Sequence, residues 1–168
     1  MESIQKIVTI TGIPSSGKST LAGLLAEFHN DAPVFCVDYV YHEMAKKLGK
    51  DIHEFTAPNG WRKMPPEEIK ELKRQTYHEM IEKFADKHHD KPWVIEGYGL
   101  CFNYDRIYLQ DALRVQFSKV KFLHLHKDVS FENWCKYKGV MGTDKRKAEY
   151  EELKAIASIY PASIRIND

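Results

Sequence analysis

One short segment near the start, residues 12–20, constrains this chain more than any other part of it. It fits the pattern G-x-x-x-x-G-K-[ST] and reads Gly12-Ile13-Pro14-Ser15-Ser16-Gly17-Lys18-Ser19-Thr20. An apolar run at residues 7–10 precedes it, and apolar residues at helical spacing follow it, so a strand, a loop and a helix are expected in that order. The two glycines allow successive backbone N–H groups to point at an anion, and the helix adds the positive end of its dipole. The segment, which we call the phosphate loop, therefore predicts a phosphate site.

The side chains of the phosphate loop favour a nucleoside triphosphate. Lys18 can reach the β- and γ-phosphates, and the Ser19 hydroxyl can bind Mg²⁺. The other predicted nucleotide contacts come from Gly12, Ser15, Ser16, Gly17 and Thr20. We therefore expect ATP and Mg²⁺ as cofactors, with Lys18 also taking part in catalysis. The alternative is an ordinary glycine turn that caps a helix.

The charge of the whole chain is almost balanced, with 25 lysines and arginines against 24 aspartates and glutamates. No net field therefore favours nucleic acid or an anionic membrane as a partner. The three cysteines, Cys36, Cys101 and Cys135, have no C-x-x-C spacing, which argues against a disulfide framework and a structural zinc site. The N-terminus lacks a signal-peptide pattern and no apolar run is long enough to cross a bilayer, so we expect a cytoplasmic protein without a membrane partner.

Apolar runs and helical patterns alternate along the chain. Strands are expected at about residues 6–11, 34–37, 93–95, 120–126 and 164–166. Helices are expected at about residues 18–28, 39–48, 65–87, 105–117, 130–138 and 144–159, with an irregular stretch at 50–64. Such alternation predicts an α/β fold with a parallel sheet covered by helices on both faces. We expect a single domain over residues 1–168.

The loop and this order of elements resemble those of the small P-loop kinases. This group contains nucleoside monophosphate kinases, shikimate kinase, dephospho-coenzyme A kinase and chloramphenicol phosphotransferase. The likeness in element order covers nearly the whole chain, whereas only residues 12–20 form a specific motif. The resemblance implies a three-layer P-loop kinase fold with a mostly parallel five-stranded sheet, and an ATP-dependent phosphotransferase. It also implies an acceptor-binding region at about residues 38–90 and a mobile lid at about 136–147.

Two carboxylates follow predicted strands, where open parallel sheets bind ligands. Asp38 matches the place where hydroxyl kinases of the group carry an aspartate that faces the acceptor, so we predict that it orients an acceptor hydroxyl and accepts its proton. Glu96 matches the acidic residue that precedes a glycine in the nucleotide kinases, and we predict that it joins Ser19 at the metal. The alternative for Glu96 is a solvent-facing carboxylate at the end of a strand.

Five more side chains are predicted to contact substrate or to lie in the lid. In the irregular stretch, Trp61 is expected to stack on a ring and Arg62 to bind an anionic substituent, although Trp61 can equally hold the loop against the core. Arg106 is expected to point into the same pocket or to pair with an acid on its own helix. Arg146 is predicted to bring positive charge to the transferred phosphoryl group, with Lys138 second, and the alternative is a solvated basic helix start.

Arginine is scarce, with six residues against nineteen lysines, and Gly97 is followed by Tyr98-Gly99 instead of the phenylalanine-proline-arginine of typical nucleotide kinases. Because arginine gives the forked grip on phosphate, both facts favour a neutral hydroxyl acceptor. The leading hypothesis is a kinase that moves the γ-phosphate of ATP to a hydroxyl of a nucleoside or similar small molecule. The alternatives are a nucleoside monophosphate kinase, a kinase of a hydroxyl on nucleic acid, and a nucleotide-binding regulator without an acceptor.

Two further features bear on ligands. In the group, residues after the fifth strand pack against adenine, and this chain has few residues after 166, so the base is held elsewhere or is selected loosely and the choice of ATP over GTP is not deduced. His124 and His126 alternate on one face of a strand, as a metal pair can. Without a third ligand at useful spacing, we expect them to be half-buried side chains packed under a helix.

Overall fold

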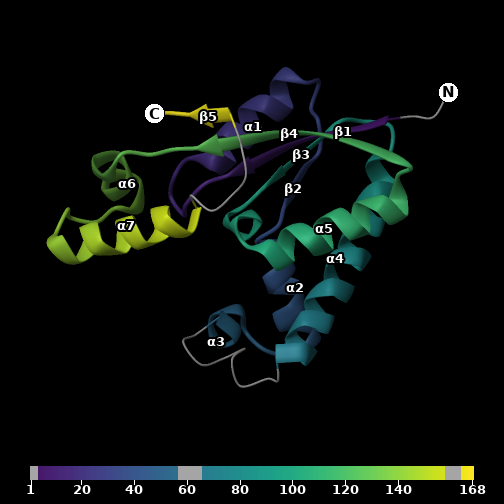
Figure 1. Ribbon diagram of the computed structural model, residues 1–168, viewed down its shortest axis with the longest axis horizontal. Coiled ribbons are helices and arrows are strands. Elements are labelled where there is room, and N and C mark those ends of the chain that lie inside the picture. The colour runs from purple at the N-terminus through teal and green to yellow at the C-terminus, as the bar shows by residue number, and fades with distance from the viewer. Residues whose placement is uncertain (1–3, 57–65, 158–163) are drawn as a thin grey trace.

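A parallel five-stranded sheet forms the centre of the molecule (Figure 1). The computed structural model describes residues 4–56, 66–157 and 164–168. The strands are β1 (Ile4–Thr11), β2 (Val34–Cys36), β3 (Trp93–Glu96), β4 (Lys119–Lys127) and β5 (Ile164–Ile166). They lie in the order β2-β3-β1-β4-β5, and every neighbouring pair is parallel. Their carboxyl ends therefore meet at one edge, which is where ligands of open α/β sheets bind.

Helices cover both faces of this sheet. The helices of the described residues are α1 (Lys18–Phe28), α2 (Tyr39–Lys47), α3 (Ile52–Thr56), α4 (Pro66–His88), the 3-10 turn η2 (Tyr98–Cys101), α5 (Asn103–Gln116), α6 (Phe131–Lys138) and α7 (Asp144–Ala157). Figure 1 shows α1 on one face and α4 and α5 on the other, while α6 and α7 lie beyond the end to which β4 points. None of the helices among the described residues combines the length and the apolar composition that crossing a bilayer requires.

The side chains of β3 contribute to the apolar core on both faces of the sheet. β3 reads Trp93-Val94-Ile95-Glu96 and is buried along its whole length, as a strand with helices on both sides must be. Trp93 and Ile95 pack with residues of α4 and α5, whereas Val94 packs with the alanines of α1. Alternate side chains of one continuous apolar run thus supply both halves of the core.

A third apolar cluster joins α6 and α7 to the phosphate loop. Trp134 and Tyr150, which are both buried, pack there with Ile13 of the loop. The indole N–H of Trp134 donates to the Pro14 carbonyl at 2.9 Å, and the Tyr150 hydroxyl donates to the Val129 carbonyl at 2.6 Å. The two late helices are therefore packed directly against the loop at the carboxyl edge.

The predicted fold class is confirmed, and all five predicted strands are present. The prediction for residues 50–64 was wrong in its described part, because Ile52–Thr56 forms the short helix α3. A helix of five residues is too short to show a helical repeat of apolar residues, so the sequence pattern could not reveal it. Trp61 and Arg62 lie outside the described residues.

Candidate active site

The phosphate loop connects β1 to α1, as predicted, and two of its positions require glycine. A side chain at Gly12 would place its Cβ 2.6 Å from the Ser16 Oγ and 2.8 Å from the Lys127 carbonyl oxygen. Gly17, the N-cap of α1, has a left-handed backbone with φ 86°. The first glycine permits a close approach and the second a conformation that other residues adopt only with strain. Both glycines are therefore needed for the loop to adopt this backbone conformation.

Two polar side chains of the loop, Ser16 and Lys18, are buried, and Lys18 has no carboxylate partner among the described residues. Lys18 is only 8% exposed, and its ammonium donates to the Ile13 carbonyl at 3.5 Å. Among the described residues, no carboxylate lies within ion-pairing distance of Lys18, and the buried Ser16 Oγ has no hydrogen-bond partner. A buried cation is unfavourable unless an opposite charge is near it. The loop therefore fits an anionic ligand.

Ser19, within the loop, lies beside Glu96 at the end of β3. The Ser19 hydroxyl donates to Glu96 Oε1 at 3.2 Å. Glu96 is 5% exposed, so it is not a solvent-facing carboxylate, and its buried Oε2 has no hydrogen-bond partner among the described residues. A hydroxyl and a carboxylate are oxygen ligands of the kind that Mg²⁺ takes, so the pair fits a magnesium site. The unpaired Oε2 supplies the observation that supports this fit.

Cys36 is a neighbour of Glu96 to which sequence reasoning gave no role. It pairs with Glu96 across β2 and β3, so both side chains point to the same face of the sheet. Burial, together with the charge and hydrogen bonding of Glu96, raises the pKa of the Cys36 thiol to about 12. Only its place at the end of a strand could have drawn attention to it.

A cavity of about 650 Å³ runs along the phosphate loop. Besides residues 15–21 it is lined by Leu24, Lys127, Tyr137, Asn167 and Asp168. Leu24 and Tyr137 are 60% and 55% exposed, so they offer apolar surface at the mouth of the cavity. The sequence suggested that little remained after β5 to contact a base, yet the two residues after that strand lie in this cavity.

Asp168 is fixed in this cavity by three donors. Its carboxylate accepts from the Lys127 ammonium at 2.9 Å, the Ser130 N–H at 2.9 Å and the Asn133 amide at 2.8 Å. Burial works against the charged form, but these donors hold the pKa of Asp168 well below its usual range. The short tail is thus held against the end of β4.

Asp38 lies at the carboxyl edge, as predicted, and begins α2. It is half-buried, and its Oδ1 accepts from the Gly99 N–H at 3.2 Å. Glu96 and Asp38 therefore flank the same edge from adjacent strands, with the phosphate loop on the other side of β3. The hydrogen bond from the Gly99 N–H fixes one oxygen of the Asp38 carboxylate and thereby orients the other.

Beneath Asp38, a buried polar network occupies the space between α2, α4 and α5. Asp105 is fully buried and accepts from the Tyr77 hydroxyl at 2.8 Å, the Lys73 ammonium at 3.1 Å and the Tyr41 hydroxyl at 3.3 Å. Lys73 also donates to the Tyr41 hydroxyl at 2.9 Å. Burial, with the charge of Asp105, raises the pKa values of Tyr41 and Tyr77 far above their usual range. Sequence reasoning missed this network, which we call the Asp105 network.

The predicted basic residues are held by groups close to them in sequence. Arg106 donates to the Leu100 carbonyl at 3.0 Å and to the Asn103 side chain. Arg146 donates to Glu149 at 2.6 Å, and Lys138 pairs with the same carboxylate. Arg146 is not among the residues that line the phosphate-loop cavity. Its predicted contact with a phosphoryl group therefore stays a prediction.

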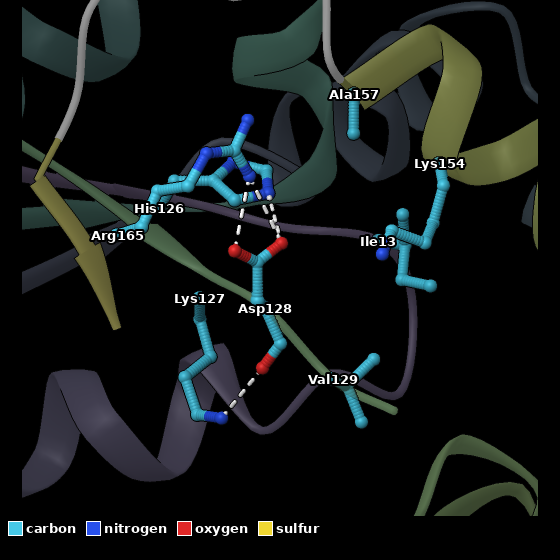
Figure 2. Close-up of a pocket in the computed structure, with 8 residues that line it drawn as sticks. All are labelled: Ile13, His126, Lys127, Asp128, Val129, Lys154, Ala157 and Arg165. Carbon is cyan, nitrogen blue, oxygen red and sulfur yellow. Dashed lines mark hydrogen bonds and ion pairs between the residues drawn. The ribbon is translucent and has the colours of Figure 1, made fainter. Parts of the chain in front are cut away.

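A smaller pocket of about 210 Å³ lies between the loop, the end of β4 and α7, and Figure 2 shows Asp128 at its centre. Arg165 donates to both oxygens of Asp128 at 3.0 Å, and His126 Nε2 lies 3.4 Å from one of them. The other ring nitrogen of His126 lies 2.8 Å from the Thr11 hydroxyl. Burial lowers the pKa of His126, and Asp128 opposes this only in part. These contacts are those of a structural histidine that helps to hold β5 on β4.

No protein-family model matches the chain. Among curated proteins, it is 42% identical over 50 residues to a cytidylate kinase of Methanocaldococcus jannaschii, and 39% identical over 56 residues to a cytidylate kinase of Methanopyrus kandleri. The matches cover 30% and 33% of this chain and 28% of each relative. The matched part is therefore less than a third of the length of these curated relatives.

Solved structures match along nearly the whole chain. Shikimate kinase from Aquifex aeolicus is 22% identical with a TM-score of 0.52, and the match covers 96% of this chain and 85% of that one. TT1252 from Thermus thermophilus is 15% identical with a TM-score of 0.62, covering 99% and 90%. APS kinase from Mycobacterium tuberculosis is 15% identical with a TM-score of 0.54, covering 98% and 88%. The resemblance expected from the sequence is thus confirmed at the level of architecture: this chain has the fold of the small P-loop kinases.

Proposed function

We propose that the chain is an ATP-dependent kinase that transfers the γ-phosphate of ATP to a hydroxyl group of a nucleoside or similar small molecule. The observation that carries this proposal is the buried Lys18 without a carboxylate partner, beside Ser19 and Glu96 at the carboxyl edge. Support also comes from the names of similar proteins, which include cytidylate, shikimate and APS kinases.

The residues of the site divide the work of phosphoryl transfer, which depends mainly on positioning and charge neutralisation. Lys18 and the backbone amides of the phosphate loop bind the phosphates, and the Ser16 hydroxyl gains a partner there. Ser19 and Glu96 hold Mg²⁺, which when bound neutralises charge on the phosphate oxygens. The exposed surfaces of Leu24 and Tyr137 contact the base.

Asp38 acts on the acceptor. The Gly99 N–H holds its Oδ1, so the other oxygen is free of that contact and can accept the proton of a hydroxyl as the new bond to phosphorus forms. This one donor also holds the carboxylate at the same edge as Glu96. The predicted lid, residues 136–147, brings Arg146 or Lys138 to the phosphoryl group, and each must first leave Glu149.

A panel of acceptors tests this proposal, with ADP release measured in the presence of ATP and Mg²⁺. We expect one hydroxyl acceptor to be phosphorylated, and Asp38→Asn to lower its kcat about a hundredfold or more while ATP affinity is unchanged. Asp111→Asn, an exposed aspartate on α5, is the matched control and should behave like the wild type. ATP binding without turnover of any acceptor would instead favour a nucleotide-binding regulator.

A nucleoside monophosphate kinase is the second candidate, because the curated relatives are named cytidylate kinases. Such an acceptor brings its own anionic phosphate and needs cations more than a base. The panel therefore includes cytidine and its monophosphate. Turnover of the monophosphate alone, unaffected by Asp38→Asn, would support this candidate against the first.

A further inference from the structure

A thiol lies next to the two residues that the proposed function gives to magnesium. Cys36 is the last residue of β2 and Glu96 the last of β3, and the two are in register in the sheet. The Ser19 hydroxyl, from the first turn of α1, donates to Glu96 Oε1 at 3.2 Å. A hydroxyl, a carboxylate and a thiol from three different elements thus converge on one place.

These three side chains line one cavity of about 630 Å³ along the free edge of β2. Cys36 is half-buried and lines this cavity together with Glu96 and Ser19. The Glu96 Oε2 is buried there and has no hydrogen-bond partner among the described residues, which a bound cation would remedy. The orphaned oxygen is the independent sign that the place is built for a ligand.

We propose that Cys36, Glu96 and Ser19 form one cation site that binds thiophilic divalent ions such as Cd²⁺, Zn²⁺ and Co²⁺ more tightly than Mg²⁺. Binding of such an ion displaces the Cys36 thiol proton to solvent, and the resulting thiolate is a soft ligand that favours such ions, whereas a hydroxyl and a carboxylate alone favour hard ions. Cys36 therefore sets the selectivity of the site. The inference rests on the proposed function for the place of the magnesium, and it extends that function to the choice of metal.

Cd²⁺ titration of the nucleotide-free chain tests the proposal without any measurement of activity. Calorimetry gives the affinity, and the ultraviolet charge-transfer absorption of a cadmium–thiolate bond identifies the ligand. We expect one Cd²⁺ per chain, with Cys36→Ser removing the absorption and weakening Cd²⁺ binding at least about tenfold. The affinity for Mg²⁺ should change less than about twofold in the same variant, because sulfur contributes little to binding a hard ion.

Two further variants keep the result interpretable. Cys135→Ser removes a buried thiol outside this cavity and should leave the absorption intact. Ser19→Ala should weaken Cd²⁺ binding without removing the absorption, which checks the site even where Cys36→Ser does not fold. Absence of Cd²⁺ binding to the wild type, or an absorption that survives in Cys36→Ser, would overturn the proposal.

Lys18→Met separates this inference from the proposed function. It should weaken ATP binding at least about a hundredfold and leave Cd²⁺ binding to the nucleotide-free chain at least as tight as in the wild type, because Lys18 does not line the cavity and its loss removes a positive charge beside Ser19. A wild type that binds Cd²⁺ through Cys36 but phosphorylates no acceptor would remove the kinase proposal alone. A chain that turns over an acceptor with a Cys36→Ser metal profile equal to the wild type would remove the metal proposal alone.

Discussion

The phosphate loop and the Asp105 network each contain a buried charged side chain, but only the charge of the network is paired with an opposite charge among the described residues. Asp105 is fully buried and is satisfied by an ammonium and two hydroxyls from neighbouring helices. Lys18 is almost as deeply buried, and its polar contact among the described residues is a carbonyl oxygen at 3.5 Å. Since a buried charge is unfavourable without an opposite charge, the first arrangement is complete within the protein, and the second fits an anionic ligand.

The unpaired polar atoms follow the same division. Among the described residues, the buried side-chain oxygens without a hydrogen-bond partner are Ser16 Oγ and Glu96 Oε2. Both belong to residues in or beside the phosphate loop, and none belongs to the Asp105 network. The unsatisfied polar atoms therefore coincide with the proposed binding site, whereas the satisfied ones belong to the framework between α2, α4 and α5.

Asp105→Ala should give the largest change in stability. It leaves the Lys73 ammonium, whose side chain is 14% exposed, without its carboxylate. We expect a loss of about 3–5 kcal/mol in the free energy of unfolding, measured by urea denaturation. Asp111→Ala on the same helix removes an exposed pair and should cost less than about 1 kcal/mol. Equal effects of the two variants would show that the Asp105 network does not hold α2, α4 and α5 together.

Glu96→Gln should have the opposite effect to Asp105→Ala, a large loss of turnover with little change in stability. It removes a buried negative charge that has one unpaired oxygen, so the free energy of unfolding should stay within about 0.5 kcal/mol or rise. Turnover should fall about a hundredfold, which corresponds to about 2.7 kcal/mol in the transition state. Steady-state kinetics and urea denaturation of the same preparation measure both quantities. A variant that loses stability but keeps its turnover would show that Glu96 supports the fold and does not act in the site.

The pH dependence of stability should show the smallest effect, through His126. Burial lowers its pKa in the folded state, although Asp128 opposes this and Arg165 and Lys154 add to it. The unfolded chain therefore takes up the proton first, so the contribution is complete above about pH 6.5 and is lost as the pH falls below that value. His126→Gln should flatten this part of the curve of unfolding free energy against pH. A curve that keeps its slope in the variant would assign the effect to other groups, among them His124, whose pKa burial also lowers.

The difference between the two regions also explains what the sequence could predict. The phosphate loop is contiguous, so its glycines, Lys18 and Ser19 could be recognised as one motif, and Glu96 could be predicted from its place at the end of an apolar run together with the resemblance to the nucleotide kinases. The Asp105 network takes its members from positions 41, 73, 77 and 105, and only the packing of three helices brings them together. Nothing in the spacing of those residues marks them as partners.

The same reasoning applies to the fold and to Cys36. Apolar runs bounded by turns were sufficient for the strands and their parallel arrangement, because a buried strand must be apolar on both faces. In contrast, the convergence of Cys36 with Glu96 and Ser19 depends on strand order, which places β2 beside β3 at the edge of the sheet. Strand order is a property of the assembled sheet and leaves no trace in local patterns.

Lys18→Met gives the most direct test of the central claim, that the buried ammonium is unpaired because a nucleotide phosphate is its partner. The measurement is the affinity for ATP with Mg²⁺ by calorimetry, together with the free energy of unfolding of the nucleotide-free chain. We predict at least about a hundredfold loss of affinity, with an unfolding free energy equal to or above that of the wild type. Retained ATP affinity, or a loss of stability as large as that of Asp105→Ala, would contradict the account.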